Sequence, residues 1–379
     1  MRGEICVMPR VLIDAAAVPA DRGALIRYVD GLTGALHRAG ADLIIVCQRA
    51  DADRYSRLAP SARVIPGPPS ITNRSTRLTW EQTSLPVLAQ QAGAQVIHAP
   101  YYSMPMRSGL PTVVTVHDVT WFTDPSRHGL EKASYIRSAT RTAARRANRV
   151  IVPSKATRDE LIRVLAADPT RIDVAYHGVD QAIFHPPSEA EIKRATNRCG
   201  LHGRPYVAFL GALEPRKNVP NLIRGFARAV EGMTDPPALV IGGGVHEEDV
   251  DAACRELAAT VRVVRPGYLS NGEICGFLGG AQVVAFPSMG EGFGLPVLEA
   301  MACGAPVLTT HRTSLPEVGG DAVAYTEPDA AAIAVALRQL LDAPERLAQL
   351  SAAGLARARE FTWDASAEAH LGAYLRAVE

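Results

Sequence analysis

Short apolar runs alternate with helix-like segments along this chain, and the whole alternation occurs twice. In the first half the apolar runs are RVLIDA (10–15), DLIIVCQ (42–48), AQVIHAP (94–100), PTVVTVHD (111–118) and NRVIVPS (148–154). In the second half they are YVAFLGAL (206–213), PALVIGGG (237–244), VRVVRPGY (261–268), AQVVAFPS (281–288) and APVLTT (305–310). Such runs are typical of parallel strands that are buried on both faces. The fold class that we predict is therefore α/β, with two Rossmann-like, doubly wound parallel-sheet domains.

The two series are separated by residues 178–205, which show no strand pattern and contain several prolines and glycines. We place the hinge at Pro186 and Pro187, so the N-terminal domain covers residues 1–186 and the C-terminal domain covers residues 187–360. Residues 361–379 have the pattern of an amphipathic helix that crosses back to the N-terminal domain. Doubly wound domains bind ligands at the carboxyl ends of their strands, so we expect the two domains to face a central cleft.

Composition excludes several classes of protein. The net charge is +1 over 379 residues, so nucleic acid is not an expected partner. The six cysteines include no C-x-x-C pair, which predicts neither a zinc knuckle nor a disulfide framework and favours a reducing cytoplasm. The first residues lack the apolar core of a signal peptide, and no run of about 18 apolar residues is present, so we expect no membrane span.

The first candidate binding loop follows the run YVAFLGAL. Arg216 and Lys217 precede Pro220, which suits the first turn of a helix, and Asn218 is placed to cap that helix. Free N–H groups at a helix N-terminus, together with two cations, make a site for a diphosphate. The alternative is that the two cations are simply solvated in a surface loop.

The second candidate loop follows the run AQVVAFPS and contains the glycine-rich turn MGEGFG. It places Glu291 and Glu299 eight residues apart, and its glycines let backbone N–H groups approach a ligand closely. We expect Glu299 in the first helical turn, where its carboxylate can accept hydrogen bonds from a ribose diol, with Glu291 nearer the rest of the ligand. The acid and the nucleophile of a glycosidase are also two carboxyl groups, so that alternative stays open.

The motifs GALEPRKN (211–218) and EGFGLPVLEAMACGAPVL (291–308) closely resemble those of the retaining GT-B glycosyltransferases of family four. The resemblance continues through VTVHDVTWF (114–122), ANRVIVPSKATRDEL (147–161), YHGVDQAIFHP (176–186), LPEVGGDAVAYTEPD (315–329) and FTW (361–363). In addition, LTWEQTSLPVLA (78–89) resembles the lipopolysaccharide-type mannosyltransferases. The resemblance implies a hexosyltransferase that moves a sugar from a nucleotide sugar to a glycan or lipid-linked acceptor. It favours GDP-mannose as the donor, with UDP-sugars as the alternative.

The resemblance also implies roles for individual residues. Arg216 and Lys217 would bind the donor diphosphate, Glu299 the ribose and Glu291 the sugar hydroxyls. The catalytic set that it implies is His117, Asp118, Arg216, Lys217 and Glu291. The donor-binding set is Gly23, Gly211, Arg216, Lys217, Tyr268, Leu269, Glu291, Gly292, Phe293, Gly294, Leu295 and Glu299, with Tyr268 and Leu269 near the nucleobase. No tightly bound cofactor and no metal ion are expected, because the two cations carry the charge of the leaving diphosphate.

One segment departs from the family pattern. Members usually carry a G-G-V-G-R-Y loop, whereas here the segment is RGALIRY (22–28). It keeps Gly23, has Ala24, and has Ile26 where glycine or alanine is common. Ile26 either narrows the approach to the diphosphate or faces the core side of its helix. A sugar-nucleotide epimerase and a catalytically silent nucleotide-sugar-binding protein remain alternatives to the transferase.

A cationic stripe runs through residues 132–150. Arg137, Arg141, Arg145 and Arg149 recur at intervals of four, with Lys132 and Arg146 alongside and no acidic residue between 132 and 149. On a helix these arginines would share one face. Either that face is solvated, or it contacts anionic lipid headgroups or the phosphate of a lipid-linked acceptor, which would make the protein peripheral to the membrane. Residues 66–80 and 100–108 are expected to recognise the acceptor.

Overall fold

The computed structural model describes residues 8–18, 23–123, 130–244, 248–258 and 261–379. The chain forms two compact units, unit 1 with residues 1–178 and 362–379, and unit 2 with residues 179–361. The division thus falls before the hinge that we expected at Pro186 and Pro187. The backbone N–H of Val179 donates to the carbonyl oxygen of Phe361 at 3.2 Å, which ties the start of the connecting segment to unit 2.

Unit 1 is built on a parallel sheet. Within the described part of the chain it has seven strands in the order β3-β2-β1-β4-β5-β6-β7. The strands are β1 (Val11–Asp14), β2 (Leu43–Cys47), β3 (Arg63–Pro66), β4 (Val96–Ala99), β5 (Thr112–Thr115), β6 (Arg149–Val152) and β7 (Ile172–Val174). The helices are α1 (Ala24–Arg38), α2 (Ala52–Leu58), α3 (Arg74–Gln91), α4 (Thr120–Thr123), α5 (Leu130–Arg146), α6 (Lys155–Leu165) and α15 (Trp363–Val378). All residues of β1, β2, β4 and β5 are buried, as expected for strands that helices cover on both faces.

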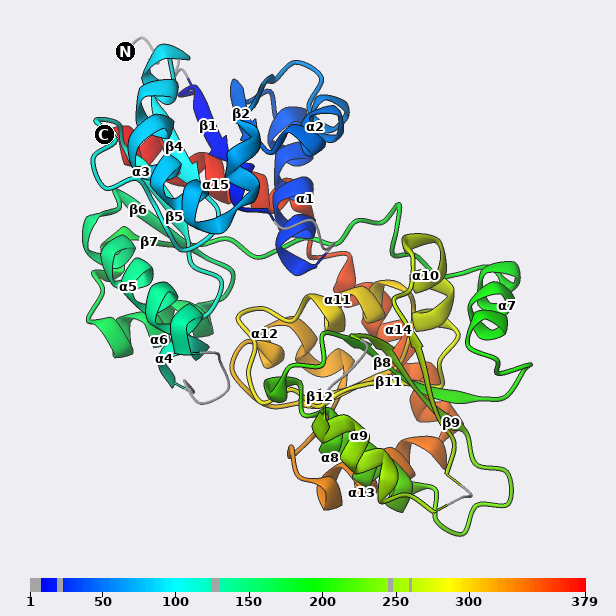
Figure 1. Cartoon of the computed structure of the whole chain (residues 1–379). Helices are drawn as coiled ribbons and strands as arrows, with labels where there is room; N and C mark the ends of the chain where they lie inside the picture. Colours follow the sequence, from blue (N-terminus) through cyan, green and yellow to red (C-terminus); the bar gives the residue numbers. More distant parts are fainter. Residues whose placement is uncertain (1–7, 19–22, 124–129, 245–247, 259–260) are drawn as a thin grey trace, which may run out of the picture. The chain divides into compact units, whose positions relative to one another are not determined.

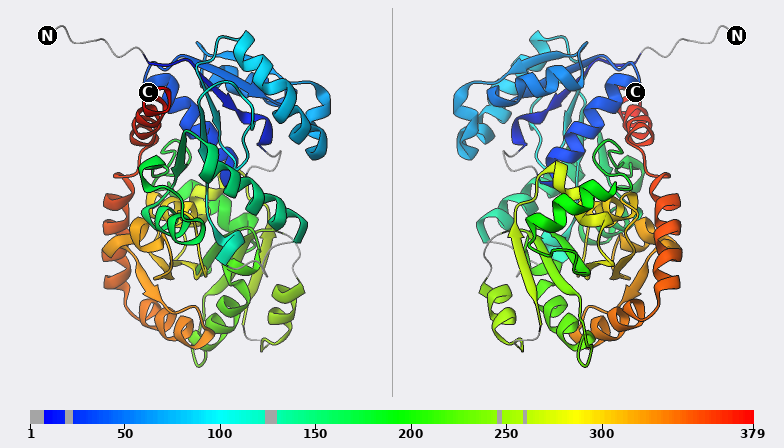
Figure 2. Two further views of the ribbon diagram at one scale, coloured as in Figure 1. Left: turned by 90° about the vertical axis from the view of Figure 1, so that its left-hand side faces the viewer. Right: turned by 90° about the vertical axis from the view of Figure 1, so that its right-hand side faces the viewer.

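Helix α15 completes the core of unit 1, although it comes from the end of the chain. It lies beside α1 (Figure 2), and a Cβ added at Gly31 of α1 would collide with the ring of Trp363. The Tyr28 hydroxyl lies 2.9 Å from His370 Nε2, and the Tyr374 hydroxyl lies 2.8 Å from His98 Nδ1. These buried hydrogen bonds, with the close helix contact, fix α15 in the position that the sequence led us to expect.

Unit 2 has the same architecture (Figure 1). Its sheet, over the residues that the structure describes, has six parallel strands in the order β10-β9-β8-β11-β12-β13. The strands are β8 (Tyr206–Gly211), β9 (Ala238–Gly243), β10 (Val263–Gly267), β11 (Val283–Phe286), β12 (Val307–Thr310) and β13 (Ala324–Thr326). The helices are α7 (Glu189–Arg198), α8 (Val219–Ala229), α9 (Glu248–Arg255), α10 (Asn271–Gly279), α11 (Leu295–Ala302), α12 (Leu315–Gly319), α13 (Ala330–Leu341) and α14 (Pro344–Ala358).

The predicted fold class is confirmed, because each unit is a doubly wound parallel sheet with helices on both faces. Short 3₁₀ turns complete the connections: Ala15–Ala17, Arg49–Asp51, Pro69–Thr72, Pro169–Arg171, Pro215–Lys217 and Gly320–Ala322. Among the described residues, none of the helices combines the length and the apolar character needed to cross a membrane.

Candidate functional site

The two candidate loops of unit 2 meet at the point where the strand order of its sheet reverses. Strands β8 and β11 are hydrogen-bonded neighbours in the centre of the sheet, yet their crossover helices leave in opposite directions along it. Crevices at the carboxyl ends of two such strands are the usual ligand sites of doubly wound sheets. Gly211 ends β8 and Phe286 ends β11, so the loops with Arg216 and with Glu291 both start at this point.

The loop after β8 is held by Asn218. This residue has a left-handed backbone (φ 62°), and its amide donates to the carbonyl oxygens of Pro287 (3.1 Å) and Pro328 (2.6 Å). Asn218 is the N-cap residue of α8, but its side chain does not cap that helix as we had expected. The amide instead ties the loop after β8 to the loop after β11, and so fixes the distance between the two candidate loops.

Glu291 binds both cations of the first loop. Its Oε2 lies 2.6 Å from Arg216 Nη1, and its Oε1 lies 2.6 Å from Lys217 Nζ and 2.6 Å from the hydroxyl of Ser288. Arg216 also donates to the carbonyl oxygen of Gly290 at 3.2 Å. Lys217 Nζ lies 4.8 Å from the centroid of the Phe286 ring, which adds a cation–π contact.

Burial sets the charge state of this cluster. Lys217 is 6% exposed and Glu291 is 8% exposed. Burial alone would raise the pKa of Glu291, but Arg216 and Lys217 outweigh it and lower that pKa to about 2. Burial lowers the pKa of Lys217, and Glu291 opposes this effect. Glu214 also pairs with Arg216, with its Oε2 2.7 Å from Arg216 Nε, so two cations face two carboxylates and these four side chains carry no net charge. What the loops offer an anionic ligand is the position of Arg216 and Lys217 at the carboxyl ends of β8 and β11.

The loop after β11 turns sharply into α11. Gly294 is the N-cap residue with φ 112°, a conformation that side chains other than glycine rarely adopt. Phe293 and Leu295 on either side of it are buried, and Gly292 is partly exposed. Glu299 is 2% exposed and is the fifth residue of α11. Our prediction that Glu299 lies in the first helical turn is therefore wrong, because the helix begins at Leu295.

Two hydroxyl groups in the loop before α12, which the sequence patterns did not single out, hold the backbone around Glu291. Thr313 Oγ1 accepts from the Glu291 N–H and donates to its carbonyl oxygen, both at 2.9 Å. Ser314 donates to the carbonyl oxygens of Glu291 (2.9 Å) and Phe293 (2.8 Å). Single serine and threonine residues about 22 positions after Glu291 have no characteristic spacing, so the sequence did not indicate their role. Ser288, by contrast, lies inside the glycine-rich motif and was open to prediction.

The two residues that the resemblance assigns to the nucleobase differ in exposure. The Tyr268 side chain is 60% exposed, whereas Leu269 is 2% exposed and packs near Gly242 of β9. Only the backbone of Leu269 is therefore available to a ligand, while the ring of Tyr268 is free to stack on a base.

In unit 1, His117 and Asp118 follow β5. His117 Nε2 lies 2.7 Å from the carbonyl oxygen of Pro100, so Nε2 must carry the proton that it donates. Burial lowers the pKa of His117, although Pro100 and Asp118 oppose this, so the ring is neutral at pH 7 with Nδ1 unprotonated. Asp118 Oδ1 accepts from the Thr120 backbone N–H (3.0 Å) and hydroxyl (2.8 Å).

The residue that departs from the family pattern at the start of α1, Ile26, packs in the apolar core of unit 1. Ile26 is 6% exposed and belongs to the apolar cluster of unit 1, so it faces the core side of its helix. Gly23 is exposed, has φ −76°, and has no atom within 4 Å of the position that a Cβ would take. Neither steric space nor backbone strain requires glycine at position 23. The side chain of Ala24 lies outside the described part of the structure.

The WEQ motif on α3 is hydrogen-bonded to residues 103–106. Glu81 Oε2 accepts from the hydroxyl of Ser103 at 2.7 Å, while the Gln82 amide donates to the Met104 carbonyl oxygen at 2.9 Å. Gln82 Oε1 also accepts from the Met106 N–H at 3.0 Å. Glu81 and Gln82 thus hold residues 100–108 in place.

The cationic stripe is shorter than we predicted. Arg149 is not on helix α5 but begins strand β6, where it forms a two-hydrogen-bond ion pair with Asp173 at 2.7 and 2.8 Å. Arg137 is half-buried, and Arg141 and Arg145 are exposed on α5. Arg141 packs against the ring of Phe122 at 5.1 Å from its centroid. The helix ends at Arg146, which breaks the four-residue spacing before Arg149.

Comparisons with known proteins agree with this organisation. The family model described as Glycosyl transferases group 1 matches residues 198–357, and the model described as Glycosyltransferase Family 4 matches residues 26–182. O-antigen chain mannosyltransferase B of Escherichia coli is 30% identical over 282 residues, which are 74% of this chain and 74% of that protein. Alpha-maltose-1-phosphate synthase of Mycolicibacterium smegmatis is 28% identical over 363 residues, 86% of this chain and 90% of that one. The crystal structure of Anabaena Alr3699/HepE in complex with UDP-glucose has the same fold, with a TM-score of 0.74, 17% identity, and coverage of 96% of this chain and 98% of that one.

Proposed function

Because this chain belongs to glycosyltransferase family 4, the group 1 glycosyltransferases with the GT-B fold, we propose that it is a retaining hexosyltransferase that binds its nucleotide-sugar donor at the β8 and β11 loops of unit 2. The observation that carries the proposal is the buried cluster of Arg216, Lys217 and Glu291. It places two cations at the strand ends where doubly wound sheets bind ligands.

In this proposal the cluster stabilises the leaving group. As the bond from the sugar C1 to the diphosphate breaks, negative charge collects on the diphosphate, and Arg216 and Lys217 are already in place to stabilise it. Glu291 keeps both cations in position, so no side chain has to reorganise when the charge develops. No metal ion and no tightly bound cofactor are needed for this step.

The remaining donor contacts are assigned on the resemblance and on exposure. Glu299 would accept hydrogen bonds from the ribose, and the ring of Tyr268 would stack on the base. The backbone N–H groups of Gly292 to Leu295 would approach the diphosphate, since the open turn at Gly294 leaves no Cβ in their way. His117 would accept a hydrogen bond from a sugar hydroxyl through its unprotonated Nδ1, with Asp118 beside it.

For the sugar we propose mannose from GDP-mannose. The Escherichia coli relative carries the name of a mannosyltransferase, and the WEQ segment resembles that subgroup. A UDP-sugar is the second candidate, favoured by the fold neighbour that was crystallised with UDP-glucose. The acceptor would be a glycan or a lipid-linked sugar, recognised by residues 66–80 and 100–108. Arg141 and Arg145 would place the protein at the cytoplasmic membrane surface.

The glycosidase interpretation fits the cluster poorly. A glycosidase acid must carry a proton at neutral pH, and Glu291, with a pKa of about 2, does not. An epimerase or a silent binding protein would have the same donor cluster, so only the reaction distinguishes these alternatives from a transferase.

The test is a transfer assay with GDP-mannose and UDP-hexoses against a panel of glycan and lipid-linked acceptors, run in EDTA. Mass spectrometry would detect the product, and NMR would give its anomeric configuration. We expect an acceptor-dependent product with retained configuration, and a rate about 10²–10³-fold lower in Arg216→Ala and in Lys217→Ala. The control is Arg224→Ala on the surface of α8, where Arg224 donates two hydrogen bonds to Glu256, at 2.8 and 2.9 Å. Full activity in both cluster variants, or isomerised donor without any acceptor product, would overturn the proposal.

A further inference from the structure

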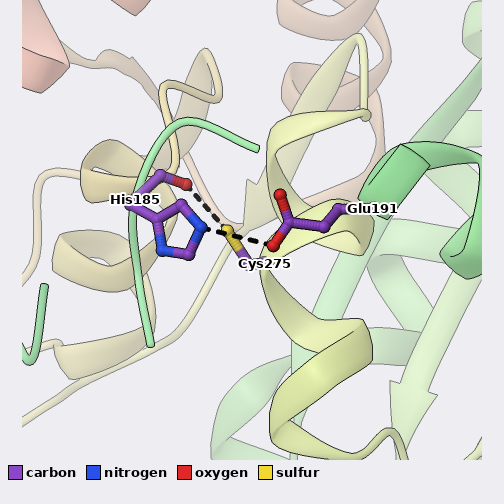
Figure 3. Close-up of side chains that lie close together, drawn as sticks. All are labelled: His185, Glu191 and Cys275. Atoms are coloured by element: carbon purple, nitrogen blue, oxygen red, sulfur yellow. Dashed lines mark hydrogen bonds and ion pairs between the residues drawn. The ribbon is translucent and has the colours of Figure 1, made fainter. Parts of the chain in front are cut away.

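A second cluster of ligand-type side chains lies in unit 2, in segments far apart in the sequence. His185 is in the segment that leads into α7, Glu191 is on α7, and Cys275 is on α10 (Figure 3). One ligand atom from each of the three lies within 4.8 Å of the other two. Figure 3 shows the imidazole of His185 and the carboxylate of Glu191 directed toward the sulfur of Cys275. The transferase proposal uses none of these side chains.

A fourth side chain borders the cluster. Cys303 is the C-cap residue of α11, and its Sγ lies 3.9 Å from Cys275 Sγ. Both thiols are buried, whereas His185 and Glu191 are partly exposed. The cluster is thus accessible to solvent on the side formed by His185 and Glu191.

Two of the separations in the cluster match those within one tetrahedral metal site. With zinc bonds of about 2.3 Å to sulfur, 2.05 Å to nitrogen and 2.1 Å to oxygen, two sulfur ligands lie about 3.8 Å apart and a nitrogen and an oxygen about 3.4 Å apart. The two sulfurs here are 3.9 Å apart, and His185 Nε2 is 3.3 Å from Glu191 Oε1. These two separations equal two edges of a zinc coordination sphere. Cys303 lies outside the set whose ligand atoms are all within 4.8 Å of one another, so its sulfur has to turn toward His185 and Glu191 to complete the sphere.

The backbone around the cluster is closely packed, which restricts where its side chains can lie. A Cβ at Gly276 would collide with the carbonyl of Glu191, and one at Gly279 would collide with Pro187. Glu191 is also oriented by Ser188, whose backbone N–H (2.8 Å) and hydroxyl (2.7 Å) donate to Oε2, so that Oε1 is the oxygen turned toward His185. A carboxylate held in this way is the arrangement that positions metal ligands in proteins.

We propose that His185, Glu191 and Cys275 bind a zinc ion, with Cys303 supplying the fourth ligand. Zinc is the metal that this donor set favours, because thiolate and imidazole ligands in a tetrahedral arrangement suit it, whereas magnesium and calcium take oxygen ligands. On binding, Cys275 gives up the proton that it donates to the His185 carbonyl oxygen at 2.7 Å, and Cys303 gives up its own.

The role of this ion is structural. It would fasten the start of unit 2 and α7 to α10 and to the C-terminal end of α11. The ion would therefore stiffen the helix that carries Glu299, since the Cys303 N–H donates to the Glu299 carbonyl oxygen at 3.1 Å. The site has no open position for substrate, so it adds no step to the transferase chemistry.

The test uses the full chain, prepared with a reductant, stripped with a chelator and then titrated with Co²⁺ and with Zn²⁺. We expect one tight Co²⁺ per chain, with tetrahedral d–d bands and a thiolate-to-cobalt absorption band in the near ultraviolet, and displacement of the Co²⁺ by Zn²⁺. In Cys275→Ser and in His185→Ala the affinity should fall by at least about 100-fold, beyond the 10–100-fold typical of an outer-shell partner. The matched control is Cys254→Ser on α9, a partly exposed cysteine outside the cluster, which should bind as the parent does.

A measurement on the parent protein tests the proposal even if a variant fails to fold. Zn²⁺ should raise the melting temperature of the stripped parent, and a chelator should reverse the rise. The proposal is overturned if the parent binds no Co²⁺ tightly, or if Cys275→Ser binds with unchanged affinity and the same thiolate band. It is equally overturned if Cys275 and Cys303 form a disulfide that persists in the reduced preparation.

Discussion

Replacing Lys217 by methionine tests the charge cluster at the carboxyl ends of β8 and β11. Methionine keeps most of the stem that packs near Phe286 but removes the ammonium that lies 2.6 Å from Glu291. The buried carboxylate of Glu291 then has Arg216 as its one remaining cationic partner in the cluster. Breaking a buried ion pair by removing one partner is strongly destabilising, because the other charge stays buried.

The pKa of Glu291 sets the scale of the effect. A fall from 4.5 to about 2 means that the ionised carboxylate favours the native state by about 3 kcal/mol. Since the folded pKa is the lower one, this contribution is complete above pH 4.5 and is lost as the pH falls toward 2. Removing one partner of a buried ion pair typically costs about 3–5 kcal/mol. Because Arg216 remains, we expect Lys217→Met to lower the unfolding free energy by somewhat less, about 2–4 kcal/mol at pH 7.

Urea unfolding followed by far-UV circular dichroism measures this cost. The three tryptophans, Trp80, Trp121 and Trp363, all lie in unit 1, so tryptophan fluorescence reports that unit and serves as an internal control. Adding Glu291→Gln to Lys217→Met should recover at least about 1 kcal/mol, since no unpaired carboxylate is then buried. The destabilisation by Lys217→Met should also shrink below pH 4.5. Strict additivity of the two substitutions, or a cost that does not change with pH, would refute the reasoning.

Three further predictions concern other parts of the chain. Burial, with the charge of Asp14, raises the pKa of Glu81 from 4.5 to about 7, so the native state loses stability as the pH rises from 4.5 through 7. Glu81→Gln should therefore match the parent near pH 4.5 and exceed its unfolding free energy by up to about 3 kcal/mol at pH 8, by tryptophan fluorescence; a constant difference would contradict this. Gly294→Ala should cost about 1–2 kcal/mol and weaken donor binding, because φ is 112° and the Cβ would lie 2.9 Å from Leu315 Cδ2. Its control, Gly272→Ala in α10, where no atom lies within 4 Å, should not destabilise the protein. Charge reversal of Arg141 and Arg145 should reduce co-sedimentation with anionic vesicles at low salt, and unchanged binding would remove the proposed membrane face.

Most of the strands that the sequence predicted have largely buried apolar runs, but the edge strand β10 (Val263–Gly267), which is only partly buried, was predicted as well. Three strands were missed: β3 (Arg63–Pro66), β7 (Ile172–Val174) and β13 (Ala324–Thr326). All three lie at sheet edges and are three or four residues long, and most of their residues are partly or fully exposed. An edge strand pairs with a neighbour on one side only and is more exposed to solvent. Its residues therefore need not form the continuous apolar run that identifies a central strand.

The two loops of unit 2 were predictable because glycine, proline and charge stand together at a strand end. What the sequence did not predict is that Glu291 binds both cations, since the distance between positions 217 and 291 depends on the pairing of β8 with β11. The cluster of His185, Glu191, Cys275 and Cys303 was hidden for the same reason. Its residues come from separate elements, whereas C-x-x-C spacing identifies only sites whose ligands are close together in the chain.

The central claim is that the loops after β8 and β11 bind a nucleoside diphosphate sugar, and ligand-induced stabilisation tests it most directly. The melting temperature would be measured with GDP, UDP, ADP and their hexose conjugates, for the parent, for Glu299→Gln, and for the exposed control Glu345→Gln. A ligand at a hundred times its dissociation constant adds about 2.7 kcal/mol to the unfolding free energy. We predict a clear shift with one base, strongest for GDP-mannose, that Glu345→Gln retains and Glu299→Gln loses. No shift with any of these nucleotides, or an equal shift in Glu299→Gln, would contradict the claim.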